Sequence, residues 1–89
     1  MPKQLVIVER KAQKQLEKLP EETRGRIVKA LLVLQDEGFS KNLDIKKLQG
    51  LGNTYRIRVG KHRILFQLTK EKTIEVYAVL PRETAYSQV

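Results

Sequence analysis

The chain has 89 residues, no cysteine and a formal net charge of +8 at pH 7. A chain of this length is expected to form one domain over residues 1–89, and the lack of cysteine excludes a disulfide framework and a thiolate metal site. With no run of about 18 apolar residues and no cleavable leader, the sequence predicts a soluble cytoplasmic protein with no membrane partner.

The N-terminal part of the chain predicts one strand followed by two helices. Residues 4–8 are a short, mostly β-branched run, which indicates a strand buried on both faces or nearly so. A helix is expected over residues 9–19, where apolar side chains recur at spacings of four and three residues. Pro20 ends this helix and can begin a second one, for which Gly38 is a natural stop. The two helices should form an αα-hairpin on one side of a sheet.

Residues 40–54 are predicted to be a polar connector that ends in a turn, because Gly50 and Gly52 lie close together before the next segment. Lys46 and Lys47 come shortly before that segment. Two interpretations of this pair stay open: contacts with RNA, and exposed lysines that only keep the protein soluble.

Residues 55–68 carry the clearest pattern in the sequence, a hairpin with one apolar and one cationic face. Apolar and charged residues alternate over its first five positions, which is typical of a strand with one buried side. Gly60 and Lys61 then suit a two-residue type II′ turn. This turn places Arg58 opposite Arg63. The apolar face holds Tyr55, Ile57, Val59, Ile64, Phe66 and Leu68, and the other face holds Arg56, Arg58, Arg63, Leu65 and Gln67.

The second face of this hairpin carries three guanidinium groups and no carboxylate. Directly opposed like charges destabilise a sheet, so their presence favours an anion-binding surface over an ordinary solvated one. The wider charge distribution agrees, because residues 46–89 carry nine Lys or Arg against three Asp or Glu. A phosphate-rich partner is therefore expected, with further candidate contacts at Lys46, Lys47, Lys61 and Gln67.

A last strand is expected over residues 73–80, and Arg82 just beyond it could join the cationic face. A three-residue loop before this strand would pair Phe66 with Val76 and Ile64 with Ala78, so that the apolar face continues. The predicted order is strand, helix, helix and an antiparallel three-strand meander. This is an α+β fold in which two helices cover one face of a four-stranded sheet.

Four segments of the chain match one known family in order. They are Leu16-Glu17-Lys18-Leu19-Pro20, Lys47-Leu48-Gln49-Gly50, the hairpin from Tyr55 to Ile64, and Arg82-Glu83-Thr84-Ala85-Tyr86. With these segments the chain resembles the RelE/ParE superfamily of toxins from type II toxin–antitoxin systems, and most closely its RelE-like members. The resemblance implies the RelE-like fold and a cognate antitoxin, in a toxin–antitoxin heterodimer or heterotetramer. RelE-like members cleave messenger RNA on the ribosome, whereas ParE-like members poison DNA gyrase.

The resemblance to RelE-like members also implies a catalytic set. Carried over by position, this set comprises Arg56, Arg58, Arg63, Arg82 and Tyr86. Cleavage by attack of the RNA 2′-hydroxyl needs a base, stabilisation of negative charge at phosphorus and a proton for the leaving oxygen. Three arginines suit the second task because guanidinium groups are planar and permanently charged. No metal or other cofactor is then required.

The general base is the open question in this set. Tyr86 is the candidate, since surrounding arginines would lower the pKa of its phenol from about 10. Its alternative role is an aromatic that packs or stacks on a base. Many RelE-like relatives resemble one another in having lysine on the first hairpin strand, where this chain has Arg56 and Arg58, so no neutral amine is available there. His62 is expected on the core side at the end of the hairpin, as a structural or rim residue, and an acid–base role is its alternative.

The sequence thus predicts a ribosome-dependent messenger-RNA endonuclease toxin that is inhibited by a separate antitoxin. The alternative is a ParE-like toxin that acts on gyrase, or an inactive toxin-fold module that only binds its partner or RNA. Protein synthesis distinguishes the nuclease from the other two possibilities, because a nuclease of this kind stops protein synthesis and the other two leave it intact.

Overall fold

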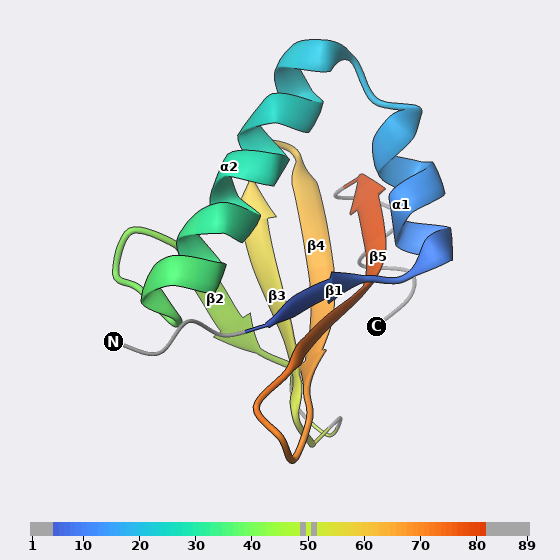
Figure 1. Cartoon of the computed structure of the whole chain (residues 1–89). Coiled ribbons are helices and arrows are strands. Elements are labelled where there is room, and N and C mark those ends of the chain that lie inside the picture. The colour runs from blue at the N-terminus through green and yellow to red at the C-terminus, as the bar shows by residue number, and fades with distance from the viewer. Residues whose placement is uncertain (1–4, 49, 51, 82–89) are drawn as a thin grey trace.

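The computed structural model describes residues 5–48, 50 and 52–81. A five-stranded sheet with strand order β1-β5-β4-β3-β2 carries two helices on one of its faces (Figure 1). In chain order the elements are β1 (Val6–Val8), α1 (Arg10–Glu17), α2 (Glu21–Glu37), β2 (Asp44–Lys47), β3 (Thr54–Val59), β4 (His62–Leu68) and β5 (Ile74–Pro81). The α+β fold and its element order are confirmed, with one strand more than expected.

Both helices form where the apolar spacing predicted them. The first, α1, buries Ala12 and Leu16 and is shorter at each end than residues 9–19. The second, α2, ends at Glu37 and is capped by Gly38, which has a φ of 72°, in the left-handed region that favours glycine. The Gly38 N–H donates to the carbonyl of Leu34 at 2.9 Å and so closes the last turn.

The first strand, β1, pairs in parallel with β5 and forms one edge of the sheet. The prediction that it is buried on both faces is wrong, because an edge strand with one covered side leaves Ile7 42% exposed. Where β1 ends, α1 takes over the same edge of β5. The N–H of Glu9 donates to the carbonyl of Val76, and the N–H of Val79 donates to the Gln15 side-chain oxygen, each at 2.8 Å.

The β3–β4 hairpin has the predicted register at every position. Arg58 lies opposite Arg63, and Ile57 lies opposite Ile64. Gly60 has a φ of 59°, as the first central residue of a type II′ turn requires. The alternation and the turn glycine together determined this pairing.

The pairing of β4 with β5 departs from the prediction halfway along. Phe66 pairs with Val76 as expected, but a β-bulge follows and Ile64 pairs with Val79, not with Ala78. Tyr77 is the extra residue, since it has no partner in the register. The bulge turns Val79 into the main core and places Ala78 opposite Leu65 on the other face.

The polar connector is partly a strand, so the prediction of four strands was wrong. Residues 44–47 form β2, which pairs antiparallel with β3 and makes the second edge of the sheet. In this pairing Asp44 lies opposite Arg58 and Lys46 lies opposite Arg56. Four residues with one apolar side chain are too short and polar to show a strand pattern in the sequence.

The main core lies between the helices and the sheet. Phe66 is fully buried in it and stacks with Tyr55 at a ring-centroid distance of 5.4 Å. Phe39, just after α2, meets both rings edge-on, at 5.0 Å from Tyr55 and 5.8 Å from Phe66. A second cluster lies on the opposite face of the sheet and consists of Leu65, Ala78 and Leu80, with Leu48 and Tyr77 packed against it.

Candidate nucleic-acid interface

The sheet face that points away from the helices carries the hairpin arginines, Arg56, Arg58 and Arg63. Their surroundings differ widely. Arg63 is only 4% exposed, and the side chain of Arg56 is 16% exposed. The side chain of Arg58 is 52% exposed. The structure therefore gathers the three predicted arginines on one face, but of these three only Arg58 is well exposed.

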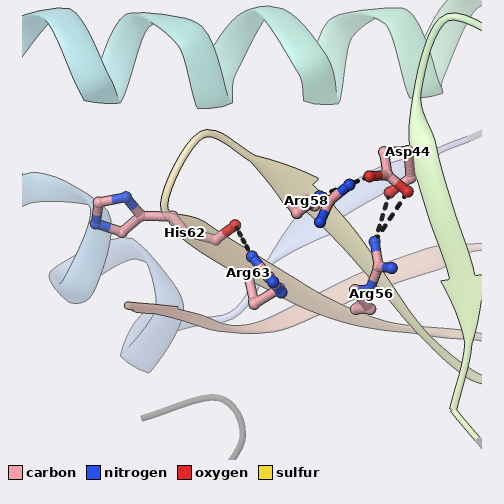
Figure 2. Close-up of polar contacts among 5 residues, drawn as sticks. All are labelled: Asp44, Arg56, Arg58, His62 and Arg63. Carbon is pink, nitrogen blue, oxygen red and sulfur yellow. Dashed lines mark hydrogen bonds and ion pairs between the residues drawn. The ribbon is translucent and has the colours of Figure 1, made fainter. Parts of the chain in front are cut away.

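A carboxylate on the neighbouring strand holds two of the three arginines. Asp44 accepts a hydrogen bond from Arg58 Nε at 2.7 Å through one carboxylate oxygen. Its other oxygen accepts from Arg56 Nη1 at 3.1 Å, and the same nitrogen donates to the Asp44 carbonyl at 3.0 Å. Figure 2 shows both guanidinium groups directed toward Asp44. The prediction of a face without a carboxylate is therefore wrong once β2 joins the sheet.

These contacts change the acidity of Asp44. The hydrogen bond from the Arg56 side chain, with the charges of Arg56 and Arg58, holds the pKa of the Asp44 carboxyl below its ordinary value despite desolvation. Asp44 was missed as a site residue because its partners lie on another strand. The register of β2 would have revealed it, since that register places Asp44 opposite Arg58.

Replacing Asp44 with asparagine should lower the free energy of unfolding by about 0.5–1 kcal/mol at pH 7, because the ion pairs are partly screened by water. Since the folded-state pKa is depressed, this stabilisation is present above the unfolded value of about 3.9 and is lost as pH falls through the folded value. Urea unfolding of both proteins between pH 3 and pH 7 measures it. The exposed loop residue Glu71 supplies the matched control, Glu71→Gln, which removes a carboxylate that forms no ion pair with the described residues and should change the free energy of unfolding at pH 7 by less than about 0.5 kcal/mol.

Arg63 lies apart from the Asp44 contacts. Its Nη1 is 3.5 Å from the carbonyl oxygen of His62, and the residue pairs with Leu80 across the β4–β5 ladder (Figure 2). The imidazole of His62 points away from the three arginines in the same view. This agrees with the register, which pairs His62 with Val59 on the core side.

The four predicted RNA contacts are all exposed but do not form one group. Lys46 lies opposite Arg56, on the face of the hairpin arginines, whereas Lys47 lies opposite Tyr55 and so belongs to the other face. Lys61 lies at the hairpin turn. Gln67 is near the other end of the hairpin, opposite Thr54 and Glu75.

Two members of the predicted catalytic set, Arg82 and Tyr86, lie outside the described residues. The described phenol on this face is Tyr77, which packs against the second cluster. Burial, and then the negative charge of Glu9, raises the pKa of Tyr77 above its ordinary value. Tyr77 therefore stays protonated at neutral pH and is unsuited to act as a base.

Two further properties bear on possible ligands. Within residues 5–48, 50 and 52–81, no three His, Cys, Asp or Glu side chains lie close enough together to hold a metal ion. In the same part of the chain, no helix has the length and apolar character needed to cross a membrane.

Comparison with known proteins identifies the family. Residues 6–86 match the model of the ParE toxin of the type II toxin–antitoxin system parDE. Comparison with curated proteins found no match. Among solved structures, the chain is similar to a chain in the RelB–RelE antitoxin–toxin complex from Methanococcus jannaschii, with 33% identity, a TM-score of 0.79 and coverage of 92% of this chain and 96% of that one.

Two further complexes show the same architecture. The archaeal RelE–RelB complex from Pyrococcus horikoshii matches with 28% identity and a TM-score of 0.78, over 92% of this chain and 97% of that one. The RelBE2 complex from Mycobacterium tuberculosis matches with 25% identity and a TM-score of 0.74, over 90% and 99%. The chain therefore belongs to the RelE/ParE superfamily of toxins from type II toxin–antitoxin systems.

Proposed function

We propose that this toxin is an endoribonuclease that cleaves messenger RNA on the ribosome in the cytoplasm and thereby inhibits translation. The observation that carries the proposal is the placement of Arg56, Arg58 and Arg63 on one face of two adjacent strands. The similarity to chains from RelB–RelE complexes supports a nuclease over other toxin activities, and it supports a cognate antitoxin as the partner in a heterodimer or heterotetramer.

In the proposed reaction the base takes the proton of the RNA 2′-hydroxyl, whose oxygen bonds to the adjacent phosphorus and forms a 2′,3′-cyclic phosphate. The bond between phosphorus and the 5′-oxygen breaks at the same phosphorus, and the departing 5′-oxygen takes a proton from water. Arg58 uses its Nε on Asp44, while its two terminal nitrogens make no hydrogen bond with the described residues and are available to a phosphate. Arg63 is mostly desolvated, so its charge acts more strongly on negative charge that develops at phosphorus. Tyr86 is the proposed base and Arg82 completes the cationic site. The positive charge comes from guanidinium groups, so this route requires no metal ion.

Primer extension on a defined messenger tests this proposal directly. Purified toxin is added to programmed ribosomes in the presence of a chelator, and a parallel reaction contains the same messenger without ribosomes. We expect cuts in the decoding site only in the first reaction. A folded toxin that leaves the messenger intact in both reactions would show that the proposal is wrong.

A ParE-like action on DNA gyrase is the second candidate, and the match of residues 6–86 to the ParE model favours it. Gyrase poisoning would leave protein synthesis intact and would produce cleaved DNA in a supercoiling assay with purified gyrase. A third outcome, neither RNA cleavage nor gyrase inhibition, would indicate an inactive module that only binds its partner or RNA.

A further inference from the structure

A cleft along α1 is lined by a group of cations that the proposed catalytic site does not use. It has a volume of about 430 Å³ and is lined by Arg10, Lys11, Lys14, Gln15 and Lys18. We call the four charged residues of this set the α1 cations. All four are exposed, and the one acid within residues 10–18 is Glu17, which accepts a hydrogen bond from Gln13 at 3.4 Å.

The α1 cations form a stripe along the helix. Arg10, Lys14 and Lys18 follow one another at four-residue intervals, which places them on one face with an axial step of about 6 Å. Like charges at this spacing destabilise a helix. No α1 cation takes part in an ion pair among the described residues. Among the described residues, no carboxylate in an ion pair with these side chains offsets the repulsion between their charges.

The helix that carries the stripe is fixed beside the end of the sheet that holds Arg63. Gln15 accepts the hydrogen bond from the Val79 N–H at 2.8 Å, which ties α1 to the second half of β5. The last residue of β5, Pro81, pairs with His62, the residue before Arg63. Figure 1 shows α1 alongside the end of β5. The α1 cations thus flank the hairpin on its β5 side, whereas Asp44 flanks it on the β2 side.

We infer that the α1 cations bind the phosphate backbone of folded RNA and dock the toxin on the ribosome, at a surface separate from the residues that cleave. This inference rests on the proposed function. Lysine offers a mobile point charge on a flexible stem, which suits phosphates in a backbone of any sequence. The α1 cations, which form no ion pair with any residue that the structure describes, release counterions when they meet such a backbone.

The composition of the cleft favours RNA over an acidic protein. Protein interfaces are enriched in aromatic residues and depleted in lysine, whereas this cleft has three lysines and no aromatic residue. The exposed large hydrophobic residues of the described chain lie on and around β1 and α2, at Leu5, Ile7, Val28, Leu32 and Phe39. A protein partner with an apolar helix would therefore find its contacts on those elements and not on α1.

A charge-matched pair of variants tests the inference. The docking variant carries Lys11→Gln, Lys14→Gln and Lys18→Gln. The control carries three substitutions at exposed lysines on other elements and loops, namely Lys29→Gln, Lys41→Gln and Lys70→Gln. Binding to purified ribosomes is measured by co-sedimentation from about 50 to 200 mM KCl, and cleavage of a programmed messenger is measured at rising ribosome concentration.

The docking variant should bind ribosomes at least about tenfold more weakly at 100 mM KCl, with the slope of log Kd against log salt reduced by about 2. Its KM for ribosomes should rise with little change in kcat, because the hairpin arginines are intact. The control should stay within about twofold of wild type in each measurement. Equal ribosome affinity and salt slope in the docking variant and wild type would overturn the inference.

Two other outcomes are distinguishable. If wild-type toxin binds ribosomes through the α1 cations but cuts no messenger, the proposed nuclease function fails and the RNA-binding surface stands. If binding of poly-L-glutamate weakens in the docking variant while ribosome binding is unchanged, the cleft is a site for an acidic protein and the inference is wrong.

Discussion

Replacing Arg63 with glutamine is expected to slow messenger-RNA cleavage on the ribosome by about 100- to 1,000-fold, the usual cost of removing one preorganised charge donor. Arg63 is the arginine of β4 and is only 4% exposed, so little water screens its charge. Arg56 and Arg58 lie on β3 and each keeps at least one nitrogen on Asp44, so neither is free to move into the place of the Arg63 guanidinium (Figure 2). Single-turnover cleavage at saturating ribosomes measures the loss.

The control for this prediction must separate chemistry from folding, because Arg63 is buried. Thermal unfolding of Arg63→Gln is measured alongside cleavage, and rates are compared only at temperatures where the variant is folded. Arg26→Gln removes one charge from α2, where the Arg26 side chain is 65% exposed and pairs with Glu22. It should cleave within about twofold of wild type. A folded Arg63→Gln protein that cleaves at the wild-type rate would exclude Arg63 from the catalytic set.

The hairpin shows what a local pattern can predict. Alternation over the first strand selects the buried side. The glycine at position 60 marks the turn, and its observed φ of 59° is a conformation that few other residues adopt. Two independent signals therefore define one register, and a shift by one residue would bury arginines in the main core. The pairing of Arg58 with Arg63 and the burial of Ile57 followed from these signals alone.

The features that were predicted wrongly all depend on contacts between distant segments. A β-bulge inserts one extra residue and so shifts the alternation of side chains between the two faces. Nothing in the local sequence of β5 shows that Tyr77 is the inserted residue. The β2 strand has four residues and is held by β3, so its own sequence carries little signal. The Asp44 contacts depend on that strand, which is why a face predicted to hold only cations contains a carboxylate.

The contacts of Asp44 affect how strongly the hairpin arginines can bind an anion. Asp44 bonds both Arg56 and Arg58, so a phosphate that approaches Arg56 meets a guanidinium already engaged with a carboxylate. Arg58, with a side chain that is 52% exposed, is the more accessible of the two. Counting cations in the sequence therefore overstated the free positive charge of the hairpin face, while the α1 cations have no such carboxylate in the described residues.

Replacing Phe66 with alanine should lower the free energy of unfolding by about 3–5 kcal/mol, the largest stability loss that we expect from a single substitution in this chain. Phe66 is fully buried, stacks with Tyr55 at 5.4 Å and meets Phe39 edge-on at 5.8 Å. Its removal should leave a cavity in the main core, next to these two rings. At about 4–8 °C per kcal/mol for a domain of this size, the melting temperature should fall by at least about 12 °C.

Phe39→Ala is the matched control, because it removes the same side chain from the same aromatic group at a site that is 45% exposed. It should cost about 1–1.5 kcal/mol, since it loses two edge-on ring contacts but leaves a space that water can enter. Urea unfolding of the two variants and of wild type compares these values. Equal losses at the two positions would contradict the prediction, because they would show that the ring contacts and not the buried volume of Phe66 determine the stability of this core.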